Sequence, residues 1–365
     1  MPRILAAMSG GVDSSVAAAL LKAQGLEVEG AYMKNWLHET DVLGHCPWQD
    51  DIDAARAAAD AIGIPFRVIN LMDAYRERVV RRLIDGYASG ITPNPDALCN
   101  REIKFGVLSD VARTGGFEAV ATGHYARRAL GPGGEWDILE AADRNKDQTY
   151  FLALLSQPQI AAARFPIGEM IKPQVREMAR RLALPNAERK DSQGICFIGK
   201  VKMSDFLSEF IPDRPGPIID TGGRVLGEHR GLHHFTLGQR RGIRVPSNTF
   251  ARAYVVVGKR TPENALVVAL EQPGAPDLYA RRATLDGVSF TGAPLTSPAR
   301  LRARPRYRAP AAPALFTPEA GGRARIEFDS PQRALTPGQV CAFYDGPRLV
   351  GGGHFAEISE TQKAI

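Results

Sequence analysis

Residues 8–15, MSGGVDSS, stand between two apolar runs, ILAA at residues 4–7 and VAAALL at residues 16–21. A glycine pair between a buried strand and a helix predicts a turn whose backbone N–H groups and helix dipole bind an anion. Asp13, Ser14 or Ser15 is expected to cap the helix. A plain βα turn is the alternative, although this whole string favours a phosphate site. The loop lacks the lysine of loops that transfer a terminal phosphate, so a different phosphate chemistry is indicated.

Segments typical of strands and helices alternate over the first two hundred residues, which predicts an α/β fold with a doubly wound parallel sheet. After about residue 212 the chain has hairpin signals, short strands and many Pro and Gly turns, which are typical of a β-rich, barrel-like domain. We expect three domains: a catalytic α/β domain over 1–200, a small central domain over 201–277 and a β-rich C-terminal domain over 278–365. The predicted strands lie at 4–8, 26–33, 66–71 and 119–122, and the helices at 14–24, 50–62, 73–89, 102–114, 172–182 and 203–210.

The composition fits a multidomain globular enzyme. The chain has 365 residues, 44% hydrophobic and 24% charged, and no apolar run approaches the ~18–20 residues of a membrane span. The first strand begins almost at once, which leaves no room for a targeting segment, so a cytoplasmic location and no membrane partner are expected. The net charge of +6 permits a polyanionic partner without requiring one.

Two of the four cysteines are predicted to be reactive, although none of the four forms a CxxC pair. Cys99 follows TPNPDAL and is expected in a loop just before a helix that begins near Asn100, where the helix N-terminus stabilises a thiolate. Asp96 is close enough to act as an acid or base in the same pocket. Cys196, in KDSQGICFIG, is also expected in a loop. Cys46 and Cys341 are interpreted as small buried hydrophobes.

Basic segments suggest contacts with RNA. LRARPRYR, at residues 301–308, places four arginines two residues apart, and on a strand these would share one face. Like charges on one face repel, so the arrangement favours an anionic partner over a merely solvated face. The basic runs at 76–83 and 239–244 fit either RNA or plain surface. His233 and His234 are adjacent and on a strand would point to opposite faces, so no metal site is expected.

Six motifs in order make a family resemblance clear: PNPDALCNREIKF, ATGHYAR, DQTYFL, KDSQGICFIG, HHFTLGQRRGI and TPGQVCAFYDG. Together with SGGVDSS, they closely resemble the bacterial tRNA-specific 2-thiouridylases, which belong to the pyrophosphate-loop ATP pyrophosphatases. The resemblance runs from residue 4 to about residue 355. It implies 2-thiolation of the wobble uridine in the tRNA anticodon arm. In the reaction that the resemblance implies, ATP with Mg²⁺ adenylates the C2 oxygen and pyrophosphate leaves. A cysteine persulfide then supplies the sulfur, and AMP leaves.

The resemblance also implies roles for individual residues. Cys196 matches the persulfide carrier, Cys99 the nucleophile that releases sulfide or resolves the product by a disulfide, and Asp96 the acid/base. A protein persulfide donor, such as a cysteine desulfurase or a sulfur-relay protein, is the implied partner. The implied ATP contacts are Ala7, Met8, Ser9, Gly10, Gly11, Val12, Asp13, Ser14, Met33 and Gly123. The implied tRNA contacts are Asn94, Pro95, Asp96, His124, Lys146, Asp147, Gln148, Arg306, Tyr307 and Gln339.

Other interpretations stay open at this point. An adenylating C–N ligase would share the first loop, but it has no use for two loop cysteines or an arginine stripe. An RNA-binding protein on a degenerate nucleotide domain conflicts with the intact SGGVDSS. The sequence also leaves open an iron–sulfur cluster held by two cysteines and an aspartate.

Overall fold

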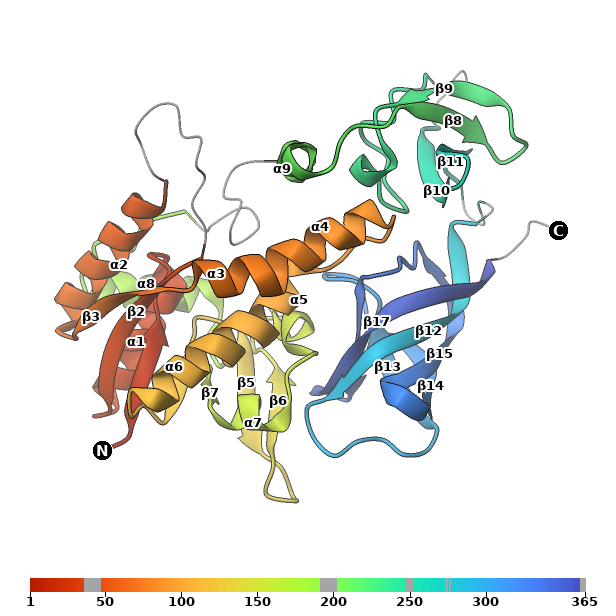
Figure 1. The fold of residues 1–365 in the computed structure, drawn as a ribbon. Coiled ribbons are helices and arrows are strands. Elements are labelled where there is room, and N and C mark those ends of the chain that lie inside the picture. Colours follow the sequence, from red (N-terminus) through yellow and green to blue (C-terminus); the bar gives the residue numbers. More distant parts are fainter. Residues whose placement is uncertain (36–46, 191–201, 247–251, 273–274, 276, 362–365) are drawn as a thin grey trace.

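The computed structural model describes residues 1–35, 47–190, 202–246, 252–272, 275 and 277–361, and its strands form three sheets (Figure 1). A five-stranded sheet belongs to the N-terminal part, a four-stranded sheet to the central part, and an eight-stranded sheet mainly to the C-terminal part. The predicted fold class, an α/β part followed by a small central part and a β-rich part, is confirmed. Within the described ranges, no helix is both long enough and apolar enough to cross a membrane.

The N-terminal sheet is parallel, with the strand order β3-β2-β1-β4-β7. The order runs outward in both directions from β1, as it does in doubly wound sheets, so the switch point lies between β1 and β4. Ligands of such sheets bind at the carboxyl ends of the strands beside this point. The strands are β1 (Arg3–Ala7), β2 (Glu27–Lys34), β3 (Phe66–Asn70), β4 (Ala119–Ala121) and β7 (Ala163–Arg164).

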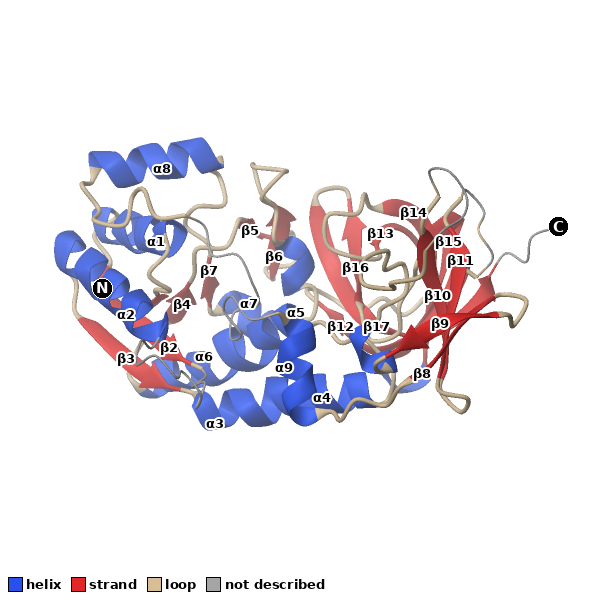
Figure 2. Cartoon of the chain, turned by 90° about the horizontal axis from the view of Figure 1, so that it is seen from above, coloured by secondary structure: helices blue, strands red, loops and turns tan. Residues whose placement is uncertain are grey.

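Helices connect these strands, and the predicted helix at 73–89 is present as three consecutive helical segments. The helical segments of this part and of the following linker are α1 (Val12–Ala23), α2 (Pro47–Ile62), α3 (Met72–Tyr75), η1 (Arg76–Val80), α4 (Arg81–Ala88), α5 (Pro95–Leu98), η2 (Cys99–Val107), α6 (Leu108–Thr114), η3 (Thr149–Leu152), α7 (Gln157–Ala161), α8 (Lys172–Arg181) and α9 (Met203–Phe210). Figure 2 shows α1 and α8 on one side of the sheet and α3, α4 and α6 on the other.

The central strands β1 and β4 are buried on both faces and are mainly apolar, whereas the outer strand β3 is largely exposed and carries Arg67 and Asn70. Leu5 of β1 packs in one core with Val79 of η1 and Leu108 of α6. The preceding residue, Ile4, packs on the opposite face with Ala55 of α2. Successive strand residues point to opposite faces, so one short apolar run contributes to both cores.

The central sheet has the order β10-β11-β8-β9. The predicted hairpin is present as an antiparallel pair of β8 (Gly216–Asp220) and β9 (Val225–His229), with Gly223 at φ +87° in the turn. A short 3₁₀ helix, η4 (Leu232–His234), follows β9. The strands β10 (Tyr254–Arg260) and β11 (Ala265–Leu270) complete the sheet.

The C-terminal sheet closes into a barrel because its first strand, β12, also pairs with β17. Strand β12 spans Tyr279–Phe290 and β17 spans Arg348–Thr361. The other strands of the barrel are β13 (Ala299–Arg304), β14 (Ala312–Glu319), β15 (Arg323–Arg333) and β16 (Val340–Asp345), and the short helix η5 (Ala320–Gly322) precedes β15. A hairpin from the N-terminal part, β5 (Ala126–Leu130) and β6 (Trp136–Glu140), extends this sheet by pairing β6 with β17. The α/β part and the barrel are therefore joined through continuous backbone pairing.

Candidate active site

The glycine-rich loop lies at the switch point of the parallel sheet, between the end of β1 and the start of α1. Gly10 has φ +78°, and a Cβ there would lie 2.5 Å from the Asp51 carbonyl oxygen. Gly123, after β4, packs so tightly that a Cβ would lie 2.6 Å from the Ser14 backbone nitrogen. Both positions therefore require glycine. The carboxyl ends of β1 and β4, on either side of the switch point, therefore both lie at the N-terminus of α1.

The predicted helix cap is wrong. Helix α1 begins at Val12 with Gly11 as its N-cap, and in the part of the chain that the structure describes no side chain caps it. The hydroxyls of Ser14 and Ser15 instead donate to the Gly11 carbonyl oxygen, at 3.0 and 3.2 Å. No side-chain cap therefore occupies the first N–H groups of the helix, which is the arrangement that an anion site uses.

A lysine does lie beside this loop, but it comes from a distant helix. Lys172, the first residue of α8, donates to both carboxylate oxygens of Asp13, at 2.8 and 2.9 Å. The Tyr125 hydroxyl donates to the same carboxylate at 2.9 Å. Lys172 is only 11% exposed. The cation that the loop sequence lacks is thus supplied by tertiary structure, at the entrance of α1.

Two further side chains hold the backbone of the loop. The amide nitrogen of Asn186 donates to the Gly10 carbonyl oxygen and to the Ser15 hydroxyl, both at 2.9 Å. Arg189 donates to the same carbonyl oxygen at 3.3 Å and pairs with Asp51. These contacts fix the carbonyl side of the loop, so its N–H groups can face a ligand.

Three other predicted nucleotide contacts, Ala7, Met8 and Met33, are buried or partly buried at the ends of strands. Ala7 and Met8 lie at the carboxyl end of β1 and are buried, and the Met8 N–H donates to the Ala31 carbonyl oxygen. Met33, near the end of β2, is partly buried and packs against the core shared with Leu5. That contact fits the core-packing interpretation of Met33.

Cys99 lies inside a helical segment and not in a loop before one, so that prediction is wrong. The helix begins earlier because the Asn94 side chain accepts the Ala97 N–H at 3.1 Å and Pro95 occupies its first turn. Cys99 follows α5 as the first residue of η2, and it is 1% exposed. Asp96 precedes it by three residues, so the two side chains are neighbours on the helix surface.

A turn of the barrel docks on the segment that leads to Cys99. Gln339 donates to the carbonyl oxygens of Thr92 and Pro93, at 2.8 and 3.3 Å, and the Thr92 N–H donates to Pro337. Gln339 and Asn94, two of the predicted tRNA contacts, are therefore brought together from positions 245 residues apart.

His124, another predicted tRNA contact, is buried and neutral. Its Nδ1 lies 2.7 Å from the Thr122 hydroxyl, and its ring packs beside those of Phe105 and Phe165, which also contact each other. Burial, followed by the charge of Lys104, holds the pKa of His124 well below its usual range. His124 therefore cannot serve as a cation for a phosphate at neutral pH.

The predicted contacts at 146–148 form part of a buried polar network. Asp147 accepts hydrogen bonds from the Ala141 N–H and the Thr149 hydroxyl, and Gln148 accepts the Tyr125 N–H at 3.0 Å. Lys146 is half-buried beside them. Gln148 thus supports the backbone of Tyr125, whose hydroxyl reaches Asp13.

The arginine stripe is not a face of four exposed charges, and this prediction is wrong. Strand β13 ends at Arg304, so Arg306 and Arg308 lie outside it. Arg304 is paired with Asp147 and Glu140, at 2.9 Å each, and is 14% exposed. The charge of Arg304 is thus neutralised by carboxylates inside the protein.

Beyond the strand, Arg306 is exposed and Tyr307 packs on the ring of Phe151, with ring centroids 4.4 Å apart. Phe151 belongs to η3 in the α/β part. Among the residues predicted to contact tRNA, Arg306 therefore offers an exposed cation next to the contact between barrel and α/β part.

The other three cysteines divide into two groups. Cys341 is fully buried in the barrel core, and burial raises the pKa of its thiol, as expected for a small hydrophobe. Cys196 and Cys46 lie outside the described residues.

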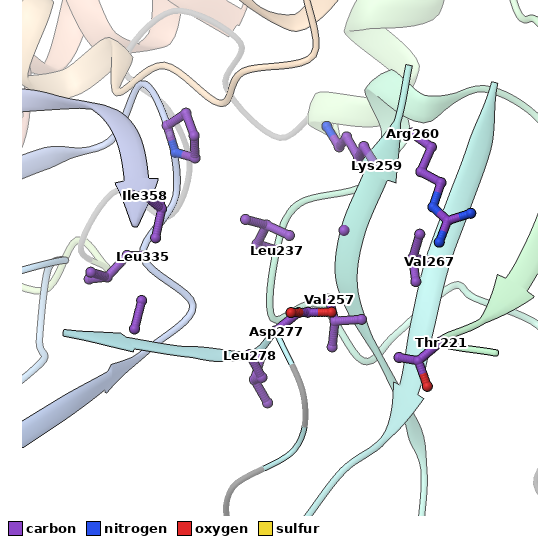
Figure 3. Close-up of a pocket in the computed structure, with 13 residues that line it drawn as sticks. Thr221, Leu237, Val257, Lys259, Arg260, Val267, Asp277, Leu278, Leu335 and Ile358 are labelled. Carbon is purple, nitrogen blue, oxygen red and sulfur yellow. The ribbon is translucent and has the colours of Figure 1, made fainter. Parts of the chain in front are cut away.

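A separate cavity of about 440 Å³ lies between the central sheet and the barrel. Figure 3 shows Leu335 and Ile358 on one side and Leu237 and Val257 facing them. Lys259 also lines it; burial lowers the pKa of Lys259 to about 8, and its amine donates to the Gly90 carbonyl oxygen. None of the lining residues is among the predicted site residues.

Comparison with known proteins covers nearly the whole chain. Three family models match: a tRNA methyl transferase HUP domain over 2–200, a tRNA methyl transferase PRC-barrel domain over 204–270 and an aminomethyltransferase beta-barrel domain over 281–355. A tRNA-specific 2-thiouridylase of Akkermansia muciniphila is 57% identical over 98% of this chain and 99% of that protein. The 2-thiouridylase of Alkaliphilus oremlandii is 43% identical over 98% and 97%.

The chain belongs to the tRNA-specific 2-thiouridylase family.

A solved 4-thiouridine synthetase bound to RNA and ATP matches more distantly, at 16% identity over 58% of this chain and 50% of that one, with a TM-score of 0.38. At this TM-score the likeness supports no conclusion. The family models carry the word methyl transferase, whereas the curated relatives are thiouridylases.

Sequence reasoning missed four residues of the site in this thiouridylase-family chain: Tyr125, Lys172, Asn186 and Arg189. Tyr125 stands in the ATGHYAR motif, which was a signal that could have been followed. Lys172 reaches Asp13 across 159 residues of chain, and local sequence carries no sign of that contact.

Proposed function

We propose that this chain is a tRNA-uridine 2-sulfurtransferase that uses ATP to 2-thiolate the wobble uridine of tRNA anticodons. Family membership supports tRNA 2-thiolation as the reaction. The geometry of the SGGVDSS loop supports the use of ATP with pyrophosphate as the leaving group. The SGGVDSS loop lies at the switch point with Lys172 and Asp13 at the N-terminus of α1. This arrangement suits a departing pyrophosphate.

In the proposed reaction, the loop N–H groups and Lys172 bind the β- and γ-phosphates of ATP while the uridine C2 oxygen attacks the α-phosphorus. The P–O bond to pyrophosphate breaks and an O-adenylated uridine forms. Negative charge builds on the departing pyrophosphate, so fixed N–H dipoles and a buried lysine stabilise that transition state. Mg²⁺, held by Asp13 and the phosphates, would neutralise part of the same charge.

Sulfur then replaces the adenylated oxygen. A protein donor loads a persulfide on Cys196. In one route its outer sulfur attacks C2, AMP departs with the former carbonyl oxygen, and the Cys99 thiolate then attacks Sγ of Cys196, which breaks the S–S bond and leaves the sulfur on C2. In the other route the Cys99 thiolate breaks that S–S bond first, and the released hydrosulfide attacks C2 as AMP departs. Either route leaves the two cysteines as a disulfide, which a reductant must open before the next turnover. Asp96, next to Cys99 on the helix surface, is proposed as the acid/base. An iron–sulfur cluster would need Cys196, which lies outside the described residues.

The tRNA is proposed to lie across the contact between barrel and α/β part. Arg306, with Tyr307 beside it, provides the exposed cation there. Gln339 and Asn94 hold the segment before Cys99 and are proposed to face the target base. The adenylating C–N ligase is disfavoured because such an enzyme has no use for a barrel docked on the segment before Cys99.

The test is mass analysis of tRNA nucleosides after incubation with ATP and a persulfide donor. We expect 2-thiouridine at the wobble position, with AMP and pyrophosphate formed in equal amounts. ADP as the main tRNA-dependent product, or a modified uridine without sulfur, would overturn the assignment.

A further inference from the structure

Asp213, His233 and His234 of the central part form a cluster that the proposed function does not use. Their ligand-type atoms all lie within 4.8 Å of one another. The expectation that the two histidines point to opposite faces of a strand is wrong, because they belong to the 3₁₀ helix η4. Their ring centroids lie only 3.9 Å apart, with the ring planes tilted by 46°.

The Nε2 atom of His233 is a buried polar atom that has no hydrogen-bond partner among the described residues, and the residue is 6% exposed. It lies 3.5 Å from Oδ1 of Asp213, so it is aimed at the carboxylate. With the ring proton on Nδ1, this nitrogen has a lone pair that it can give to a metal.

The Nε2 atom of His234 is in a conflict that hydrogen bonding cannot resolve. It lies 2.7 Å from Oδ1 of Asp213, which only accepts, and 3.1 Å from Nη2 of Arg230, which only donates. A single ring nitrogen carries either a proton or a lone pair, so it can satisfy one of these neighbours. A cation bound between Nε2 of His234 and Oδ1 of Asp213 would accept a lone pair from each of these two atoms.

We propose that Asp213, His233 and His234 bind Zn²⁺ through Oδ1 and the two Nε2 atoms, with water as the fourth ligand. Tetrahedral ligands at bond lengths of about 2.0–2.1 Å lie roughly 3.3 Å apart. The His233–Asp213 separation of 3.5 Å is close to this value, whereas the His234–Asp213 separation of 2.7 Å is that of a hydrogen bond, so the His234 ring would move outward by about 0.6 Å when zinc binds. Two imidazoles and one carboxylate are a ligand set that Zn²⁺ accepts. The Asp213 side chain is 38% exposed, which leaves a path for the ion and the water.

The surroundings resemble the outer shell of a metal site. Arg230 holds the second oxygen of Asp213 at 3.0 Å and donates to Ser208 of α9 at 3.1 Å, so the carboxylate is oriented. Gly231 lies against the ring of His233, where a Cβ would come within 2.7 Å of Cε1. The zinc would fasten the segment after α9 to the central sheet.

The test measures Zn²⁺ binding to the full chain by competition with a chromogenic chelator, after alkylation of the thiols so that thiolates do not bind the metal. We expect one high-affinity Zn²⁺ per chain. His233→Gln and Asp213→Asn should each weaken binding by at least about 10–100-fold, the loss typical even of outer-shell changes. Glu228→Gln, which neutralises an exposed carboxylate in the same sheet, is the matched control and should bind as the wild type does.

Co²⁺ gives an independent readout. The alkylated wild type should show the visible absorption of tetrahedral cobalt, and Asp213→Asn should lose it. Asp213 is exposed, so this variant decides the question even if His233→Gln fails to fold. Zn²⁺ binding that is absent from the wild type, or equal in wild type and Asp213→Asn, would overturn the proposal. None of these readouts depends on tRNA or ATP.

Discussion

Replacing Arg304 with Ala should destabilise the fold instead of removing a contact with RNA. The guanidinium makes charge-assisted bonds of 2.9 Å to Asp147 and to Glu140, whose side chains are 4% and 6% exposed. Removing it leaves the buried carboxylate of Asp147 without its cation, while Glu140 keeps its ion pair with Arg144. Breaking one partner out of a buried ion pair costs about 3–5 kcal/mol of the free energy of unfolding.

The matched control is Arg300→Ala on the same strand. Arg300 pairs with Asp329 at 2.8 Å, but the two side chains are 66% and 44% exposed. Exposed pairs contribute about 0–1 kcal/mol because water and salt screen them. The two variants share residue type and strand and have similar pairing distances; they differ in burial, and Arg304 pairs with two carboxylates where Arg300 pairs with one.

The assay is thermal unfolding of both variants and the wild type, followed by circular dichroism. At about 2–4 °C per kcal/mol, Arg304→Ala should lower the midpoint by roughly 6 °C or more, and Arg300→Ala by a few degrees at most. The triple variant Arg304→Met, Glu140→Gln, Asp147→Asn should recover part of the loss, since no buried charge is then left unpaired. Equal midpoints for Arg304→Ala and Arg300→Ala would refute the reasoning.

Three further outcomes are expected. Lys172→Ala should abolish most tRNA-dependent pyrophosphate release, whereas Lys172→Arg should retain a measurable part because it keeps the positive charge beside the loop. Full activity of the alanine variant in a pyrophosphate assay would contradict this. Arg306→Ala should flatten the dependence of log tRNA affinity on log salt by roughly 0.7–0.9, the value of one phosphate contact, and an unchanged slope in a salt titration would remove Arg306 from the RNA surface. Cys99→Ser and Cys196→Ser should each abolish 2-thiouridine formation, whereas Cys341→Ala, at a buried core thiol, should leave it intact by nucleoside mass analysis.

Local sequence was sufficient to predict the glycine-rich loop, the β-rich character of the second half and the helix start before Cys99, because residues close in the chain determine these features. The strand–glycine–helix pattern around Gly10 predicted the loop at the edge of a parallel sheet, because apolar runs and backbone freedom act over a few residues. The change to short strands and turns after residue 212 predicted the central sheet and the barrel for the same reason. The start of the helix before Cys99 was within reach as well, since Asn94 followed by Pro95 is a cap signal.

Only the tertiary structure decided which distant groups meet. Lys172 reaches Asp13, Arg304 finds Asp147 and Glu140, and Gln339 docks beside Asn94, over separations of 157 to 245 residues. The sequence alone determined the charge on Arg304, and the fold decided that this charge is neutralised internally. Local periodicity places a side chain on a face of its own strand, but what covers that face depends on strand order and on the pairing of β6 with β17, which no local pattern encodes.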